Sequence, residues 1–398
     1  MQGLRCSLAV VAAGMALTLP TPATAGIEPG DVAWTEVSAL PGLSISPDLN
    51  NTYYTSVYSA SSAHETAIRG SVPNARYWSI AVLDQAGREI ANLSDDDIET
   101  TGNGSYTVRI RHGCAGRPNC MDVSGAPASA LPARMFYRLY VPSDRTGGVP
   151  LPEVEYRTLD GVDVRSPVPA GTWTALMLGL LEPLRPGEPA PEALAGPSGL
   201  DRPVATPAAD PEPRRFDGLG GQQIETLADA GAPAPVVEAL TQAKGSAGLN
   251  ATADNDYLIA QYTFRSGNLV LAAKAPSYRS GGAAVNDLGR ADGSEQVRYW
   301  SVCTVQNTRP VECLRDERVQ VDADGFFRIV VAPACPVAGY SNCLRGGVTP
   351  SVNNGNINYR NLLAAGSFAN ERGPHECPAG VSQFCGDYAL QARYVLRG

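Results

Sequence analysis

Three histidines limit the acid–base chemistry open to this 398-residue chain: His64, His112 and His375. His375 is the best candidate for a general base, because it stands beside Glu376 in a predicted loop, and loops on a β scaffold often carry function. A surface histidine within a disulfide loop is the more common explanation of such a residue. The sequence contains no Gly-x-Ser-x-Gly motif, so the usual nucleophile elbow of a serine hydrolase is absent.

Two arginines, Arg138 and Arg360, each follow a tyrosine inside a predicted strand. An arginine that faces a concave surface can clamp a ligand carboxylate or phosphate with two parallel hydrogen bonds. A structural ion pair with a neighbouring strand is the somewhat more common explanation of such an arginine. If the protein binds a ligand through these residues, we expect Arg138, Arg360 and Tyr388 to contact it. In an enzyme, Arg360, Asp387 and His375 would form the catalytic cleft.

Acidic residues cluster at two nearly equivalent places, Asp95 to Asp97 and Asp316-Glu317. Paired carboxylates can act as acid and base or bind calcium, but a solvated turn or a helix start explains them more simply. The fragment Asp322-x-Asp324-Gly325 also resembles part of a calcium loop. Its counterpart, Thr101 to Gly104, is another turn that leads into a strand, so a hairpin turn explains both. We expect no metal site and no cofactor.

The tetrapeptide Arg76-Tyr77-Trp78-Ser79 returns as Arg298-Tyr299-Trp300-Ser301, 222 positions later. Three further matches keep the same order and nearly the same offset: Gly104 to Ile110 with Gly325 to Val331, Cys114/Cys120 with Cys335/Cys343, and Tyr137-Arg138 with Tyr359-Arg360. One module has therefore been used twice. Both tryptophans are expected in the cores, with Tyr77 and Ser79 on the opposite strand face.

The elements that must position these residues are short strands rich in Tyr, Val, Ile and Thr, separated by Gly, Pro, Asn or Asp. The fold class is mainly β: two tandem, similar, jelly-roll-like β-sandwich modules at residues 31–157 and 253–398. The linker, residues 158–252, is Pro-rich, with short helices expected at 172–182 and 222–242, and we interpret it as a partly ordered tether. The expected strands are 53–58, 64–70, 77–83, 105–111, 134–141 and 153–157, then 257–263, 269–274, 297–305, 326–331, 357–362 and 388–396.

Residues 1–25 are typical of a secretory signal, with Arg5, an apolar run from Ser7 to Leu19, and Ala23-Thr24-Ala25 before the expected cleavage site. The mature chain keeps eight of nine cysteines, and an even number in an exported protein indicates disulfides. Eight cysteines permit 105 pairings. Their spacing favours local pairs: Cys114–Cys120, Cys303–Cys313, Cys335–Cys343 and Cys377–Cys385.

The chain carries a formal net charge of −9. This acidity argues against a nucleic-acid partner or an anionic membrane surface. We expect no integral membrane segment after removal of the signal, and a secreted, extracellular protein.

The segment Arg76 to Ile80, followed by Tyr137 to Pro142, resembles a widespread bacterial β-sandwich domain of unknown function. Arg298 to Thr304 with Tyr359 to Leu363 extends the likeness to secreted, two-module actinobacterial proteins. The resemblance covers most of both modules and none of the linker. It implies a β-sandwich fold but no catalytic residue.

Duplication, scarce histidine and the lack of a catalytic motif favour a non-catalytic protein that binds an extracellular glycan or a cell-envelope component. Duplicated binding modules gain effective concentration on a repetitive ligand. The alternative is an extracellular hydrolase or lyase with a cleft in the second module. The sequence leaves open whether the protein is an enzyme.

Overall fold

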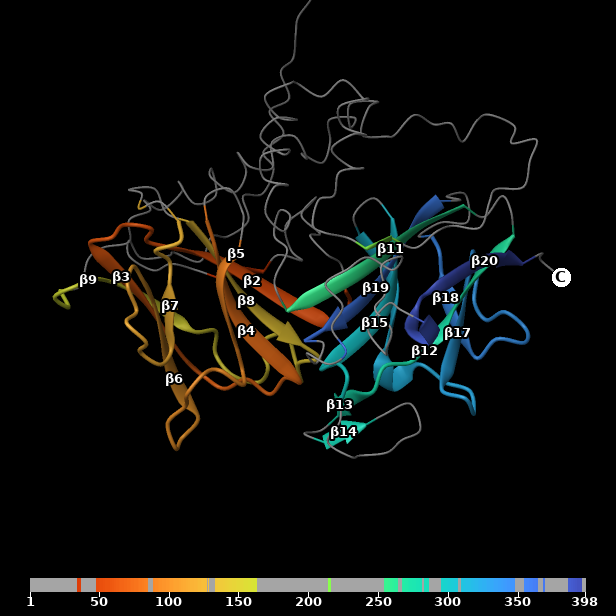
Figure 1. Cartoon of the computed structure of the whole chain (residues 1–398), viewed down its shortest axis with the longest axis horizontal. Coiled ribbons are helices and arrows are strands. Elements are labelled where there is room, and N and C mark those ends of the chain that lie inside the picture. Colours follow the sequence, from red (N-terminus) through yellow and green to blue (C-terminus); the bar gives the residue numbers. More distant parts are fainter. Residues whose placement is uncertain are drawn as a thin grey trace, which may run out of the picture.

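A computed structural model of the chain is almost entirely β (Figure 1). It describes residues 34–36, 48–84, 89–126, 128, 133–162, 214–215, 254–263, 267–280, 283–285, 295–306, 309–347, 354–363, 368 and 386–395. Within these ranges the helical elements are two single 3-10 turns, η5 (Asp316–Arg318) and η6 (Gly386–Tyr388). None of the described helices is long and apolar enough to cross a membrane. The expected signal and linker helices lie outside the described residues.

The first module is a sandwich of two sheets. The five-stranded sheet has the order β1 (Thr35–Glu36), β2 (Asn51–Tyr58), β8 (Ala133–Tyr140), β4 (Tyr77–Leu83) and β5 (Glu89–Ser94). The four-stranded sheet has the order β7 (Cys120–Asp122), β6 (Ser105–Arg111), β3 (His64–Ser71) and β9 (Glu153–Thr158).

The second module repeats this topology. Its five-stranded sheet has the order β10 (Arg214–Arg215), β11 (Asn255–Thr263), β19 (Asn354–Leu362), β15 (Tyr299–Gln306) and β16 (Arg309–Arg315). Its four-stranded sheet has the order β18 (Asn342–Arg345), β17 (Phe326–Ala332), β12 (Asn268–Lys274) and β20 (Gln391–Val395). A small hairpin, β13 (Tyr278–Ser280) and β14 (Ala283–Val285), is added in this module.

Period-two alternation along the strands builds each core. On β6, Tyr106, Val108 and Ile110 are buried while their neighbours are half-exposed. The expectation for the tryptophans is confirmed: Trp78 packs on Tyr106 at 4.8 Å between ring centroids, and Trp300 packs on Phe327 at 5.2 Å. Each tryptophan therefore bridges the two sheets of its own module.

Every strand expected from the sequence is present in the structure, although the segment expected at 388–396 is shortened to β20 and preceded by η6. The expectation omitted β5 and β16, which each form one edge of a five-stranded sheet, and the short strands β1, β7, β10, β13, β14 and β18. Neither β5 nor β16 shows a clean alternation, since β5 is almost uniformly half-buried and β16 contains Pro310 next to a register shift in its pairing. Proline is tolerated at edges and irregularities of a sheet.

Three of the expected disulfides are present: Cys114–Cys120, Cys303–Cys313 and Cys335–Cys343. The fourth expected pair, Cys377–Cys385, lies outside the described residues.

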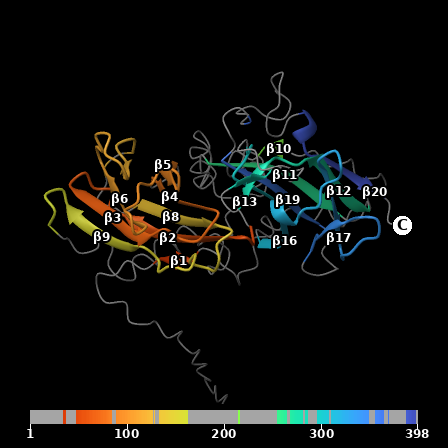
Figure 2. The same ribbon diagram turned by 90° about the horizontal axis from the view of Figure 1, so that it is seen from below.

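The two modules lie end to end along the long axis of the molecule (Figures 1 and 2). They meet where β4 and β15 begin and where β8 and β19 end. Val141 and Leu363 follow β8 and β19 directly, and both have the left-handed backbone that non-glycine residues rarely adopt, with φ of 50° and 46°. Two equivalent ends of the repeated fold therefore face each other.

Candidate functional site

Most of the buried charged side chains among the described residues lie between the modules, where they make reciprocal contacts. Arg76 of the first module donates to Asp316 of the second at 2.6 Å and contacts Glu317 at 2.5 Å. Its counterpart Arg298 donates to Asp95 at 3.2 Å and also binds the neighbouring Asp96. Each arginine thus reaches the acidic turn of the opposite module.

A second set of reciprocal contacts, the two inner sites, is more deeply buried and consists of Arg138 with Asp254 and of Arg360 with Asp48. Arg138 binds Asp254 with two parallel hydrogen bonds of 2.9 and 2.6 Å. Its counterpart Arg360 approaches Asp48 at 3.6 Å. All four side chains are at most 4% exposed. The sequence suggested that Arg138 could clamp a ligand carboxylate, but it binds the Asp254 carboxylate instead. Asp254 belongs to the other module and not to a strand next to Arg138.

Hydroxyl groups complete both inner sites. Tyr77 donates to Asp254, while Tyr299 and Ser301 donate to Asp48 at 2.6 and 2.5 Å. Burial, reinforced by the adjacent carboxylates, raises the pKa of both tyrosines well above the ordinary value. The phenols therefore remain protonated hydrogen-bond donors at physiological pH.

Aromatic packing fills the space between the two inner sites. Tyr77, Tyr140, Tyr299 and Leu362 form a buried cluster that belongs to both modules. The rings of Tyr140 and Tyr299 meet edge-on with centroids 5.6 Å apart. The Arg360 guanidinium lies over Tyr140 and Tyr257, at 5.6 and 4.9 Å from the ring centroids. This packing excludes solvent from the ion pairs. Because the local dielectric constant is therefore low, the attraction within each pair is stronger than it would be in water.

Local strand geometry explains why these side chains point away from the core of their own module. On β4, Trp78 points into the core, so Tyr77 and Ser79 point to the opposite face, as expected. On β8, Tyr137 and Leu139 are core residues, so Arg138 faces outward. The register pairs Ser79 with Arg138 and Ser301 with Arg360, which makes the two arrangements equivalent.

Burial raises the pKa of two carboxyls in the outer set of contacts, which are those of Arg76 and Arg298 with the acidic turns. Desolvation raises the pKa of Asp316 to about 6, and the opposing attraction of Arg76 offsets only part of that effect. Desolvation likewise raises the pKa of Asp95 to about 6 against the attraction of Arg298. Although burial alone lowers the pKa of Arg138, the Asp254 carboxylate reverses the direction and raises it. Arg138 thus stays charged, while Asp95 and Asp316 titrate near pH 6.

The remaining sequence candidates are not gathered at this site. Tyr388 belongs to the core of the second module, where its ring packs on Phe368 and its hydroxyl accepts from Gln296 at 3.0 Å. Asp387 is exposed in η6. Arg360 faces away from that core, because its neighbour Tyr359 is the one that points inward. His375 lies outside the described residues.

The other two histidines make local contacts. His64 Nδ1 lies 3.2 Å from the Ser59 hydroxyl, and His112 Nε2 lies 3.1 Å from the Ala60 carbonyl oxygen. Asp322 accepts from the backbone amides of Asp324 and Phe326 at 3.1 and 2.9 Å. The hairpin-turn explanation of the Asp322 motif is therefore supported by its hydrogen bonds.

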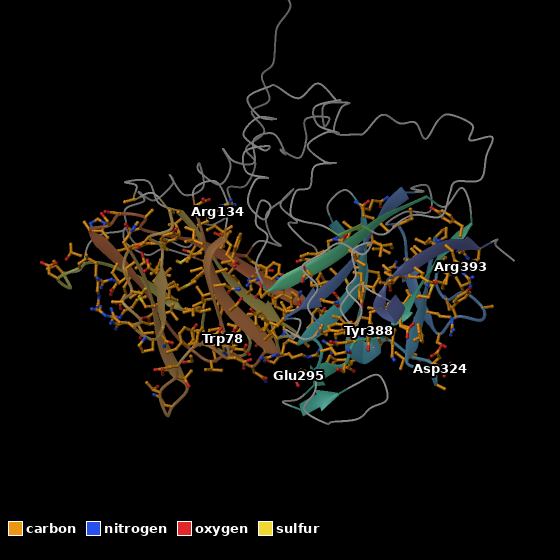
Figure 3. All side chains as sticks on the ribbon, in the orientation of Figure 1. Trp78, Arg134, Glu295, Asp324, Tyr388 and Arg393 are labelled. Atoms are coloured by element: carbon orange, nitrogen blue, oxygen red, sulfur yellow. A yellow bond between two sulfur atoms is a disulfide. The ribbon has the colours of Figure 1, made fainter. Side chains whose placement is uncertain are left out.

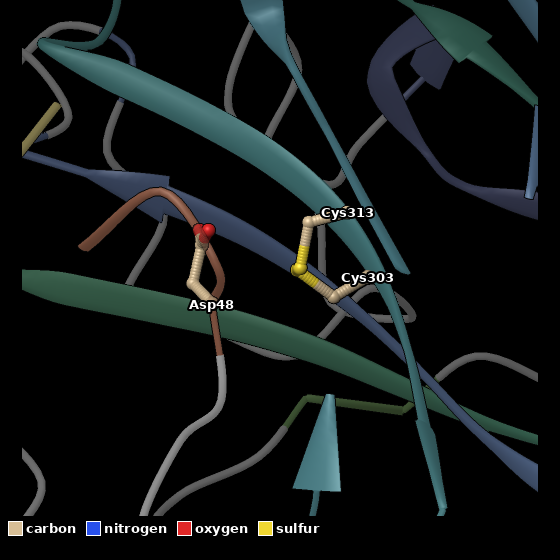
Figure 4. Close-up of side chains that lie close together, drawn as sticks. All are labelled: Asp48, Cys303 and Cys313. Atoms are coloured by element: carbon tan, nitrogen blue, oxygen red, sulfur yellow. A yellow bond between two sulfur atoms is a disulfide. The ribbon is translucent and has the colours of Figure 1, made fainter. Parts of the chain in front are cut away.

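One group of possible metal ligands occurs among the described residues, formed by Asp48, Cys303 and Cys313 (Figure 4). The two sulfurs are joined in a disulfide of 2.06 Å, so neither is a thiolate. The Asp48 carboxylate already accepts from Tyr299 and Ser301. These residues do not fit a metal site in the oxidised protein, because thiolates are the sulfur ligands that metals require.

Asp48 and Asp254 are the functional residues that sequence reasoning missed. Both stand just before the first long strand of their module, but they are only 206 positions apart, whereas the internal repeat has an offset near 222. Alignment of the repeat therefore does not superimpose them. The available signal was an aspartate one to three residues before a strand that begins with asparagine, in both modules.

No family model matches the sequence, and no curated protein matches it. Among solved structures, the chain is similar to an uncharacterized protein from Burkholderia cenocepacia, with a TM-score of 0.53 and 15% identity over 85% of this chain and 81% of that chain. The VPA0106 protein from Vibrio parahaemolyticus matches at a TM-score of 0.41 and 15% identity over 81% of this chain and 86% of that chain. At this identity, the first likeness shows the fold alone.

Proposed function

We propose that this is an exported, non-catalytic protein that binds an extracellular glycan or another cell-envelope component through its two β-sandwich modules. One observation carries the proposal. The arginine, tyrosine and carboxylate side chains that would best suit catalysis hold the two modules together instead. We place the chain with the two-module secreted proteins that it resembles, with modules at residues 31–157 and 253–398.

Export accords with the chemistry of the chain. Three local disulfides are typical of proteins that fold in an oxidising compartment. The apolar run ahead of Gly26 has the length of a secretory signal rather than of a membrane span.

The docked arrangement changes where a ligand would bind. Arg138 and Arg360 could meet a ligand only if the modules parted, because both are buried against the other module. The outer faces of the four-stranded sheets are accessible only in part, because outer residues such as Ala67 and Val330 are buried. They carry Arg69 and Arg109 in the first module and Arg328 and Arg393 in the second, all at least partly exposed. Arg393 lies on the side of the second module that faces away from the first (Figure 3).

A fixed pair of modules presents these two faces at a constant separation. A repetitive ligand of matching spacing could engage both, and the second contact would then form at high effective concentration. Arginine is suited to this role because its planar guanidinium binds carboxylate or phosphate groups of envelope polymers with two hydrogen bonds.

The experiment is a binding assay of the purified mature protein against envelope polysaccharides, with Arg69→Ala/Arg109→Ala and Arg328→Ala/Arg393→Ala as test variants. Arg117→Ala, in an exposed turn of the first module, is the matched control. Saturable binding that either double variant weakens and the control retains would support the proposal. Binding that all variants retain would contradict the assigned faces.

The alternative, a hydrolase or lyase in the second module, is tested with chromogenic glycoside and ester substrates. Turnover that His375→Ala abolishes would overturn the non-catalytic proposal. Asp387→Ala is the companion variant, since this carboxylate is exposed and lies outside the contacts between the two modules.

A further inference from the structure

We call the contacts between the two modules the docking contacts. Each module contributes both hydrogen-bond donors and carboxylate acceptors to them. The first module supplies donors and acceptors: Arg76, Tyr77 and Arg138, with Asp48, Asp95 and Asp96. The second module supplies the equivalent groups: Arg298, Tyr299 and Arg360, with Asp254, Asp316 and Glu317. A contact in which the same patch occurs on both partners, with donors and acceptors exchanged, is the kind that joins identical subunits in symmetric dimers. Here it occurs within one chain.

Nothing in these contacts depends on which chain carries the module. Arg76 requires an acidic turn, and Asp254 requires an arginine and a tyrosine hydroxyl, whatever connects them. Residues 163–213 alone comprise 51 residues between β9 and β10. A chain of that length can span up to about 170 Å when extended. Covalent connection therefore does not compel the two modules of one chain to pair with each other.

We propose that the docking face of each module also accepts the opposite module of a second copy of this chain, so that two chains exchange modules in a closed dimer. Both interfaces of that dimer repeat the contacts seen within the single chain. Within one chain the linker holds the partner module at an effective concentration that can approach the millimolar range, so the monomer dominates in dilute solution. Exchange becomes visible when the contact within the chain is made unfavourable.

Two variants, each with one charge reversed, make the contact within a single chain unfavourable. Arg298→Glu places a carboxylate against Asp95 and Asp96 of its own chain, and Asp96→Arg places a guanidinium against Arg298 of its own chain. When the two variants are mixed, the altered second module of one meets the altered first module of the other with opposite charges. The remaining two modules are unaltered at these positions. Asp96 tolerates substitution because its side chain is 60% exposed.

The two variants, with different tags, are mixed in denaturant with disulfides intact and refolded together, and size-exclusion chromatography with light scattering gives the mass. We expect a species of twice the chain mass that carries both tags. Its share should exceed that of either variant refolded alone by about tenfold or more, since like charges in contact disfavour the pairing of the two modules within one chain.

The control pair is Arg328→Asp and Asp322→Arg, which disrupts an ion pair inside the second module, away from the docking face. This mixture should give no more double-mass species than its separate components. A second test pair, Arg76→Glu with Glu317→Arg, decides the question if Arg298→Glu or Asp96→Arg does not fold. Folded variants that remain monomeric on mixing, or that form the double-mass species equally well alone, would overturn the proposal.

Discussion

The guanidinium of Arg298 donates to the backbone carbonyl oxygen of Arg76 at 3.4 Å, so the two arginines at equivalent places of the repeated fold touch each other. This contact lies between the two outer sets of ion pairs, those of Arg76 and of Arg298. Around it, each arginine binds the acidic turn that belongs to the other's module. An internal repeat has thus produced a self-complementary interface in which equivalent residues of the two modules make similar, though not identical, contacts.

Removal of one partner from the inner ion pairs should be severely destabilising. Arg138→Ala removes the guanidinium and its two hydrogen bonds from the buried Asp254 carboxylate. We expect the free energy of unfolding to fall by about 3–5 kcal/mol, as for other broken buried pairs. Urea denaturation measures the loss. Arg69→Ala, which breaks the partly exposed pair with Glu155, should cost less than about 1 kcal/mol.

A double-mutant cycle separates the ion pair from the cost of an isolated charge. Arg138→Leu/Asp254→Leu removes both charges from a site already lined by tyrosines, so the double variant should be more stable than Asp254→Leu alone. A loss of stability in the double variant equal to the sum of the losses in Arg138→Leu and Asp254→Leu would show that the two side chains act independently.

Much of the fold follows from the sequence because the alternation of buried and exposed residues on strands such as β6 is strong and repeated. The docking contacts do not follow in the same way. Arg138 was recognisable as a polar residue on an otherwise buried strand, yet its partner Asp254 is 116 residues distant in a different module. Strand periodicity specifies which face a side chain occupies, but not what covers that face. That information depends on how the two modules are placed, which no local pattern encodes.

Acidity should affect stability through the outer aspartates, with a sign opposite to that of an exposed ion pair. The folded pKa of Asp316 is about 6, above its ordinary value of 3.8, so the folded state binds a proton more tightly than the unfolded state. Its stabilising contribution is complete below pH 3.8 and is lost as pH rises through about 6. Asp95 acts in the same direction.

The measurement is thermal unfolding of wild type and Asp316→Asn between pH 5 and pH 8. Asparagine imitates the protonated carboxyl and does not titrate in this range. The variant should therefore gain stability relative to wild type as pH rises, by roughly 1–2 kcal/mol at pH 8. A relative loss on raising the pH would contradict the assigned direction.

Close backbone packing at Gly355 predicts a clash on substitution. A β-carbon at this position would lie 2.4 Å from the Tyr262 hydroxyl and 2.7 Å from the Val305 carbonyl oxygen. Since the second neighbour is backbone, it cannot move aside easily, and Gly355→Ala should destabilise the protein by about 1–3 kcal/mol. Gly102→Ala is the control, because nothing lies within 4 Å of its β-carbon. Chemical denaturation of both variants checks the difference.

The Cys303–Cys313 disulfide joins β15 and β16, whose ten-residue separation closes a short loop. Chain entropy gives such a loop a contribution of up to about 3 kcal/mol. We expect Cys303→Ala/Cys313→Ala to lower the unfolding free energy by roughly that amount without freeing another thiol. Mass spectrometry of proteolytic fragments checks the local pairing and tests the predicted Cys377–Cys385 bridge. A disulfide between the modules would contradict the local scheme.

Cleavage of the linker should leave the two modules together. The nine prolines between Pro183 and Pro213 predict an extended segment that proteases reach. After limited proteolysis there, we expect both fragments to co-elute in size-exclusion chromatography, because the aromatic cluster of Tyr77, Tyr140 and Tyr299 and the buried ion pairs cross the interface without needing the linker. The same cut in Arg138→Ala should give fragments that elute separately at low protein concentration. Separation of the cut wild-type fragments in native buffer would show that the linker, and not the docking face, holds the modules in place.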